Sequence, residues 1–182
     1  YMDSTFIQRL IDRLDPRLFI YADQTRNAKD AGLAIDDFSS YEGGNPIAPY
    51  ETVNEKAFNG DVSKVDLRYT TDPVTEPHML MGYPELQFIL AEAAVRGWIT
   101  GDANAFYEAG VRASFRFYME NAAEYASYVS EEAAGQYLEG ALVNLGNAAT
   151  DEEKIEFILT QKYLQTFLQS GWTSYNEQLR TG

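Results

Sequence analysis

Residues 83–117 constrain the fold most, because their pattern predicts two helices that must fold back on each other. Pro84 stands in a first helical turn, where a proline is tolerated because its missing N–H would be unpaired anyway. Phe88 and Ala91 add apolar surface on other sides, so we expect the first helix to be buried nearly all round. One face of it repeats at helical spacing and consists of Leu86, Ile89, Leu90, Ala93, Ala94 and Gly97.

A second helix follows after a turn at residues 99–101, and Asp102 is a good N-cap for it. Because the connection is so short, the two helices are predicted to form an antiparallel hairpin with Phe88 and Phe106 buried. Residues 101–114 also have the spacing of small and aromatic residues that is typical of a tetratricopeptide helix pair. The stripe predicted to face the core consists of Phe106, Gly110, Ala113 and Phe117.

Further helices are predicted near both ends of the chain. Residues 4–14 read as an amphipathic helix capped by Ser4, and residues 18–21 as a strand or an extended segment. Thr150 and Glu153 form a capping box for a helix that continues to residue 170.

The predicted fold class is therefore all-α. It consists of tetratricopeptide-like antiparallel helical hairpins with a long irregular loop region. We expect a single helical domain or a fragment of one, in three parts. Residues 1–22 hold a helix and an extended segment, residues 23–82 the irregular region, and residues 83–182 the helical core, with Ser130 capping one helix and residues 172–179 forming a last one.

The irregular region is the best candidate for a ligand site, because long loops in compact domains are often functional. It interleaves aromatic residues with asparagines, and sugar rings need both an apolar face to stack on and hydrogen-bond partners. We predict that Tyr41, Asn45 and Tyr50 bind the ligand. The alternative is a loop whose aromatic side chains pack onto the helices below it.

Composition excludes several functions. The net charge of −14 argues against nucleic acid and anionic membranes, because phosphate contacts need clustered Lys and Arg. The chain has no cysteine, which rules out disulfides and thiolate chemistry. No run of 18 apolar residues is present, so no segment is predicted to span a bilayer.

Few residues suggest catalysis or metal binding. His78 is the only histidine, and no nucleophile motif accompanies it. Asp36, Asp37 and Glu42 could offer oxygen ligands to calcium, but their spacing matches no known loop. Glu92 and Arg96 are four residues apart, as expected for an ion pair on a helix. We therefore predict no catalytic site, no cofactor and no metal, although a carboxylate pair for glycoside cleavage remains open among 28 acidic residues.

Three stretches in order resemble the SusD/RagB family of nutrient-capture lipoproteins. They are the helix pair ELQFILAEAAVRGW…GDANAFYEAGVRASF, the segment DPRL at residues 15–18, and ILTQKY at residues 158–163 leading to RTG at residues 180–182. The chain looks like a C-terminal fragment of such a protein. Within the motif Trp98 would be a packing residue. Where the family usually has a Trp and two arginines, this chain has Tyr175 and Leu179-Arg180.

The resemblance implies a non-catalytic oligosaccharide-binding component of an outer-membrane uptake complex. Such a protein delivers its ligand to a TonB-dependent, SusC-like transporter and is held at the cell surface by a lipid anchor outside this fragment. Two alternatives stay open, a tetratricopeptide-like adaptor that binds proteins and a glycan-active enzyme. The long aromatic loop favours glycan capture over the adaptor, which would devote its length to regular repeats.

Overall fold

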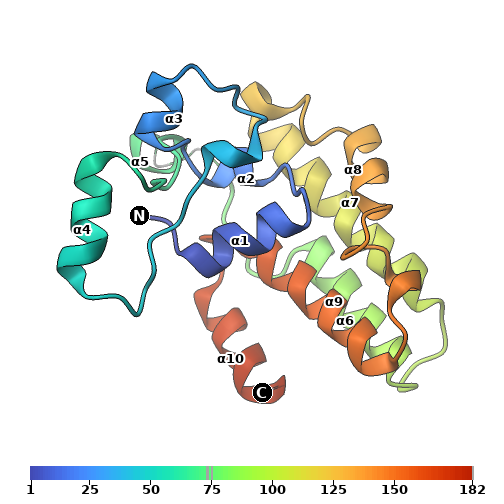
Figure 1. Ribbon diagram of the computed structural model, residues 1–182. Helices are drawn as coiled ribbons and strands as arrows, with labels where there is room; N and C mark the ends of the chain where they lie inside the picture. Colours follow the sequence, from blue (N-terminus) through green and yellow to red (C-terminus); the bar gives the residue numbers. More distant parts are fainter. Residues whose placement is uncertain (73, 75, 182) are drawn as a thin grey trace.

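The computed structural model describes residues 1–72, 74 and 76–181. These residues form helices that irregular segments connect (Figure 1). Gly182, the last residue of the RTG motif, lies outside the described residues. The described chain contains two isolated β-bridges and no β-strand. The α-helices are α1 (Ser4–Asp12), α2 (Leu18–Tyr21), α3 (Arg26–Asp30), α4 (Tyr50–Asn59), α5 (Arg68–Thr71), α6 (Tyr83–Val95), α7 (Ala103–Asn121), α8 (Glu131–Leu138), α9 (Asp151–Gln165) and α10 (Gly171–Thr181). Three short 3-10 helices join them: η1 (Phe38–Ser40), η2 (Ala123–Tyr125) and η3 (Leu145–Asn147).

The α6–α7 hairpin is the centre of the molecule, as predicted. α6 packs against both α7 and α9. The Phe88 side chain is completely buried, and its ring centroid lies 6.2 Å from that of Tyr107. Phe106 packs at the margin of the core and is only half-buried, less than predicted.

The faces predicted for the two central helices are wrong. Leu86 and Ile89 of α6 are exposed, whereas Glu85 and Glu92 are buried beside Phe88 and Ala91. Because α6 carries apolar residues on nearly every side, its hydrophobic pattern does not select one face. On α7 the buried residues are Tyr107, Gly110, Val111, Ser114, Phe115 and Tyr118, so the core-facing stripe lies about one residue C-terminal to the predicted one.

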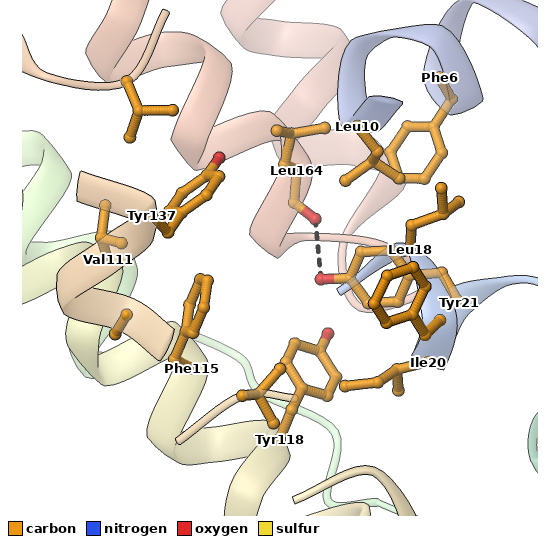
Figure 2. Packing of buried hydrophobic residues seen from close by; sticks show 14 of the residues in the cluster. Phe6, Leu10, Leu18, Ile20, Tyr21, Val111, Phe115, Tyr118, Tyr137 and Leu164 are labelled. Carbon is orange, nitrogen blue, oxygen red and sulfur yellow. Dashed lines mark hydrogen bonds between the residues drawn. The ribbon is translucent and has the colours of Figure 1, made fainter. Parts of the chain in front are cut away.

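The core is rich in aromatic side chains that several helices contribute (Figure 2). Tyr21 of α2 donates a hydrogen bond from its hydroxyl to the carbonyl oxygen of Leu164 at 3.1 Å. Its ring meets Tyr118 edge-on at 5.3 Å and lies 4.6 Å from Phe167. Residues 18–21 therefore form a buried helical turn, not the strand or extended segment that was predicted, because a short apolar run does not specify its conformation.

Arg17 lies at the centre of a buried polar cluster directly before α2. Its guanidinium is paired with Asp15 at 2.5 Å, and both side chains are fully buried. It also donates hydrogen bonds to Ser114 Oγ at 2.9 Å and to Gln161 Oε1 at 2.8 Å. Burial by itself would lower the pKa of Arg17, but the neighbouring Asp15 carboxylate outweighs this effect. The net pKa is raised, so Arg17 stays charged. One side chain of the DPRL segment thus joins α2, α7 and α9.

The helix caps follow the sequence closely. Asp102 and Ser130 cap α7 and α8, and Thr150 and Glu153 form the complete capping box of α9. The cap of α1 is Asp3, whose Oδ1 accepts from the Phe6 N–H at 2.8 Å, and not Ser4. α9 ends at residue 165, five residues earlier than predicted, and Gly171 begins α10.

Trp98 is 70% exposed just after α6, which contradicts the prediction that it packs in the core. The Arg96 guanidinium lies 5.3 Å from its ring centroid, so the indole contacts a surface cation. The left-handed backbone of Gly97, with φ of 71°, turns the chain away from the helix before Trp98. No described helix has the length and apolar character that are needed to cross a membrane.

Candidate functional site

The segment of residues 37–69, which holds the three predicted ligand residues, passes through η1, α4 and the start of α5, and α4 lies at the edge of the molecule (Figure 1). It is fastened to the chain's N-terminal end. Gly44 N donates to Met2 O at 2.9 Å, and Met2 N donates to Ser63 O at 3.0 Å. A Cβ on Gly43 would lie 2.3 Å from the Ser4 backbone, so this close approach requires glycine.

The other end of the segment is tied to α2 and the following residues. Asp66 N donates to Tyr21 O at 3.0 Å, and Asp23 N donates to Lys64 O at 2.9 Å. These backbone bonds fix both ends of the segment on the core, although the sequence shows no periodic pattern there. Its path is therefore determined by the fold and is not that of an unattached loop.

Tyr41 is packed into the core and does not face solvent. It is 3% exposed, its ring centroid lies 5.8 Å from that of Phe19, and its hydroxyl donates to Ile35 O at 2.7 Å. Burial raises the pKa of Tyr41. A sugar ring has no access to the Tyr41 ring in this structure, so the alternative reading of a loop aromatic that packs on the helices describes this residue.

Asn45 and Tyr50 are placed differently. Tyr50 is the first residue of α4 and is 77% exposed. Asn45 is also exposed, and its Oδ1 accepts from the Ile47 N–H at 3.0 Å, which fixes a turn immediately before the helix. The structure therefore puts two of the three predicted residues on the surface and separates them from Tyr41.

α4 itself is an unusual helix, because none of its ten residues, all of them described, is buried. Phe58 near its end is 81% exposed, and Ile47 before it is also exposed. The result is an aromatic and amide-bearing surface on a helix that lies at the edge of the molecule (Figure 1). Such a surface can offer stacking and hydrogen bonds to a ligand.

A buried polar cluster that no sequence pattern indicated supports the far end of the segment. Arg68 pairs with Glu76 at 2.7 Å and donates to Asn121 O at 2.6 Å. Gln169 donates to the other Glu76 oxygen at 2.7 Å. Arg68 belongs to α5, a single turn of helix that no capping or periodic signal indicated.

Asp66 completes this cluster. Its carboxylate accepts from the Arg68 N–H at 2.8 Å and from the Tyr125 hydroxyl at 2.9 Å. Burial raises the pKa of Asp66 in spite of these hydrogen bonds and the nearby Arg68 charge. Since each Asp66 oxygen accepts a hydrogen bond from the protein itself, the cluster holds the segment in place.

The structure assembles no metal site around the candidate calcium ligands. Among the described residues, no three His, Cys, Asp or Glu side chains are grouped so that they could hold a metal ion. Asp37 accepts from Ser39 N at 2.9 Å and from Ser39 Oγ at 2.7 Å, so its carboxylate caps η1. His78 is exposed.

Comparison with known proteins places the whole chain in one group. A family profile described as "Starch-binding associating with outer membrane" matches residues 1–182. The chain is 55% identical to a SusD homologue from Bacteroides fragilis, with a TM-score of 0.94. It is 52% identical to an outer membrane protein from Bacteroides vulgatus described as involved in nutrient binding, with a TM-score of 0.96.

A second Bacteroides fragilis SusD homologue is 36% identical and has a TM-score of 0.90. The chain is covered to 98–99% in these three comparisons but spans only 39% of each relative's length. No curated protein sequence matches the chain significantly.

Proposed function

This chain belongs to the SusD-like family, described as starch-binding and associated with the outer membrane, and from this premise we propose that it is part of a protein that captures oligosaccharides at the cell surface. The family match carries the function. The proposed location of the site is supported by the exposed aromatic surface of α4: Tyr50 begins this helix and Asn45 lies in the turn before it, on a segment that backbone hydrogen bonds hold at both ends.

The proposed contacts are stacking and hydrogen bonding. Tyr50 offers an aromatic ring on a helix, so the backbone that carries it is rigid. Asn45 keeps its amide nitrogen for the ligand while its oxygen holds the turn. Tyr41 supports the site without contacting the ligand. Its buried ring and its hydrogen bond to the Ile35 carbonyl hold the backbone that leads to Asn45.

We assign capture without cleavage to this surface. Asp66 and Glu92, two carboxylates whose pKa values are shifted, are bound by the Tyr125 hydroxyl and the Arg180 guanidinium, and the exposed Asp37 caps η1 through Ser39. These carboxylates therefore stabilise the fold, and we assign only ligand binding to the exposed surface. Delivery to a TonB-dependent, SusC-like transporter and a lipid anchor in the outer membrane belong to the proposal through the family resemblance.

The test is a calorimetric titration of the full-length protein with malto-oligosaccharides and other glycans. Tyr50→Ala should weaken binding about five- to tenfold, because one stacking contact contributes on the order of 1 kcal/mol. Tyr83→Ala is the matched control, since Tyr83 is also exposed but lies outside the segment. Equal affinity of Tyr50→Ala and wild type would reject this site, and released reducing ends would replace capture by hydrolysis.

A further inference from the structure

A groove of about 960 Å³ lies on a different part of the molecule, between α1, α9 and α10. Its lining includes Arg9 from α1, Lys162 and Tyr163 from α9, and Tyr175, Glu177 and Gln178 from α10. No residue of the segment 37–69 contributes to it. The groove is therefore separate from the site proposed above.

The α10 wall of the groove is held by polar contacts. None of the eleven residues of α10, which the structure describes in full, is buried. Arg180 reaches across to α6 and forms two hydrogen bonds of 2.7 Å to the carboxylate of Glu92. Lys162 pairs with Glu177 at 3.2 Å. These charged contacts hold α10 to the body of the protein and keep the groove's polar groups in fixed positions.

Two aromatic rings line the groove, Tyr163 on α9 and Tyr175 on α10. Tyr163 is 41% exposed. Its ring packs edge-on against Phe6 of the core, with 5.6 Å between the ring centroids and an interplanar angle of 80°. Tyr175 is 56% exposed and makes an edge-on contact with Trp172 at 6.2 Å. Both rings are oriented by an aromatic neighbour and still have exposed surface. Half-exposed, oriented tyrosines offer contact area at a small entropic cost.

The groove lining carries basic side chains (Arg9, Arg96, Lys162 and Arg180) and acidic ones (Glu152, Glu156 and Glu177), and Arg180 also pairs with Glu92, so the two signs nearly balance. Arg180 pairs with Glu92 and Glu177, and Lys162 pairs with Glu177. Salt-bridge partners lower the pKa values of Glu92 and Glu177 in spite of the burial that raises them, so both carboxylates remain ionised at neutral pH. A ligand that carries a net charge would gain little here, whereas hydroxyl groups find both donors and acceptors.

Resting on the glycan-binding function proposed above, we propose that this groove is a second binding site for a neutral oligosaccharide, with Tyr163 and Tyr175 contacting sugar rings and polar lining side chains binding the hydroxyls. The groove uses residues that the α4 surface does not, so the full-length protein binds two ligand molecules or two parts of one long glycan. Arg9, which is exposed on α1, supplies donors at that side of the groove.

The first experiment compares binding stoichiometry in full-length protein. Wild type, a Tyr163→Ala, Tyr175→Ala double variant, Tyr50→Ala and the Tyr83→Ala control are titrated with maltohexaose, xylohexaose and mannohexaose. We expect the double variant to lose one of two binding events or to weaken it at least tenfold, while Tyr50→Ala affects the other. Affinity should be nearly the same at low and high salt, because no net charge attracts the ligand.

The second experiment needs no variant and so does not depend on how well the double variant folds. Hydrogen exchange of wild-type protein is measured with and without a saturating hexasaccharide. We expect slower exchange in residues 171–181 when the ligand is present. Unchanged exchange there, or preferential binding of an oligogalacturonide over the neutral sugars, overturns the proposal.

The outcomes separate the two sites. If the double variant binds like wild type while Tyr50→Ala loses affinity, the groove proposal is wrong and the proposed function stands. If no glycan binds to wild-type protein, both fail. If a peptide occupies the groove and sugars do not, the site is that of an adaptor and the inference is overturned.

Discussion

A Cβ atom added to Gly110 would lie 2.7 Å from Cε1 of Phe88, so α6 and α7 approach each other where only a glycine fits. The Phe88 ring is completely buried between the helices of the core. Interiors are packed densely enough that one added methyl group at such a point forces a shift. The hairpin predicted from the turn at residues 99–101 therefore depends on a single small residue in its second helix.

We expect Gly110→Ala to destabilise the protein by about 1–3 kcal/mol, the usual cost of overpacking. Gly135→Ala is the control, because that glycine is also helical but its added Cβ would meet only the Arg112 guanidinium at 3.9 Å. There we expect a gain of about 0.5–1 kcal/mol from helix propensity. Urea unfolding of both variants measures the two effects, and equal signs would contradict the close approach.

Arg17→Met should cost about 3–5 kcal/mol, because it leaves the fully buried Asp15 carboxylate without its partner. Arg116→Met is the matched control, since Arg116 pairs with Glu131 on the surface, where water screens the pair and its loss should change stability little. Denaturant melts at pH 7 give both values. A loss below about 1 kcal/mol for Arg17→Met would show that the cluster is not an essential part of the core.

Acidification should weaken the attachment of α10. The pKa of Glu92 is lowered, because the hydrogen bonds and charges of Arg180 and Arg96 outweigh the burial that raises it. A lowered folded-state pKa stabilises the fold above the unfolded value of about 4.3 and loses this effect as the pH falls through the folded value. Unfolding free energies measured from pH 7 to pH 3 should therefore fall more steeply for wild type than for Glu92→Gln.

Glu108→Gln is the comparison for that experiment, because Glu108 accepts only from the exposed Asn104 side chain of its own helix. Its curve should follow that of the wild type. If Glu92→Gln also follows the wild-type curve, the ion pairs do not contribute to the stability of the fold between these pH values. High salt should reduce the wild-type stability at pH 7 as well, since Arg180 is partly exposed and its contacts are screened.

Trp98→Ala should cost less than about 1 kcal/mol, the size of an exposed cation–π contact with Arg96. Acrylamide should quench Trp98 nearly as well as free indole in a Trp172→Phe background. Weak quenching together with a loss of several kcal/mol would return Trp98 to the core, where the family motif alone had placed it.

The sequence predicts those features that depend on neighbouring residues. Thr150 and Glu153, three residues apart, cap α9. The turn before Asp102 is so short that the chain must reverse direction between α6 and α7. The face of α6 depends on distant partners, because Glu92 is buried only where Arg180, 88 residues later, reaches it. No local pattern contains that information.

The candidate site shows the same division. Composition identifies the segment, but it does not distinguish Tyr41 from Tyr50, since both are tyrosines among turn residues. Their exposures differ because Phe19 lies beside one ring, while the other lies on a helix without a buried residue in its described length. Which aromatic side chain is available to a ligand is decided by the tertiary fold.

The buried Arg17 cluster has a consequence for how the chain folds. Its partners Ser114, Tyr137 and Gln161 are 97, 120 and 144 residues away along the chain. Repeat proteins can begin folding at any repeat and extend from there, since each repeat contacts only its neighbours. Asp15 can pair with Arg17 locally, but a guanidinium that is buried before these distant segments arrive would lack part of its hydrogen bonds. Compact, partly assembled states are thereby disfavoured, and the helical hairpins are coupled into one cooperative unit.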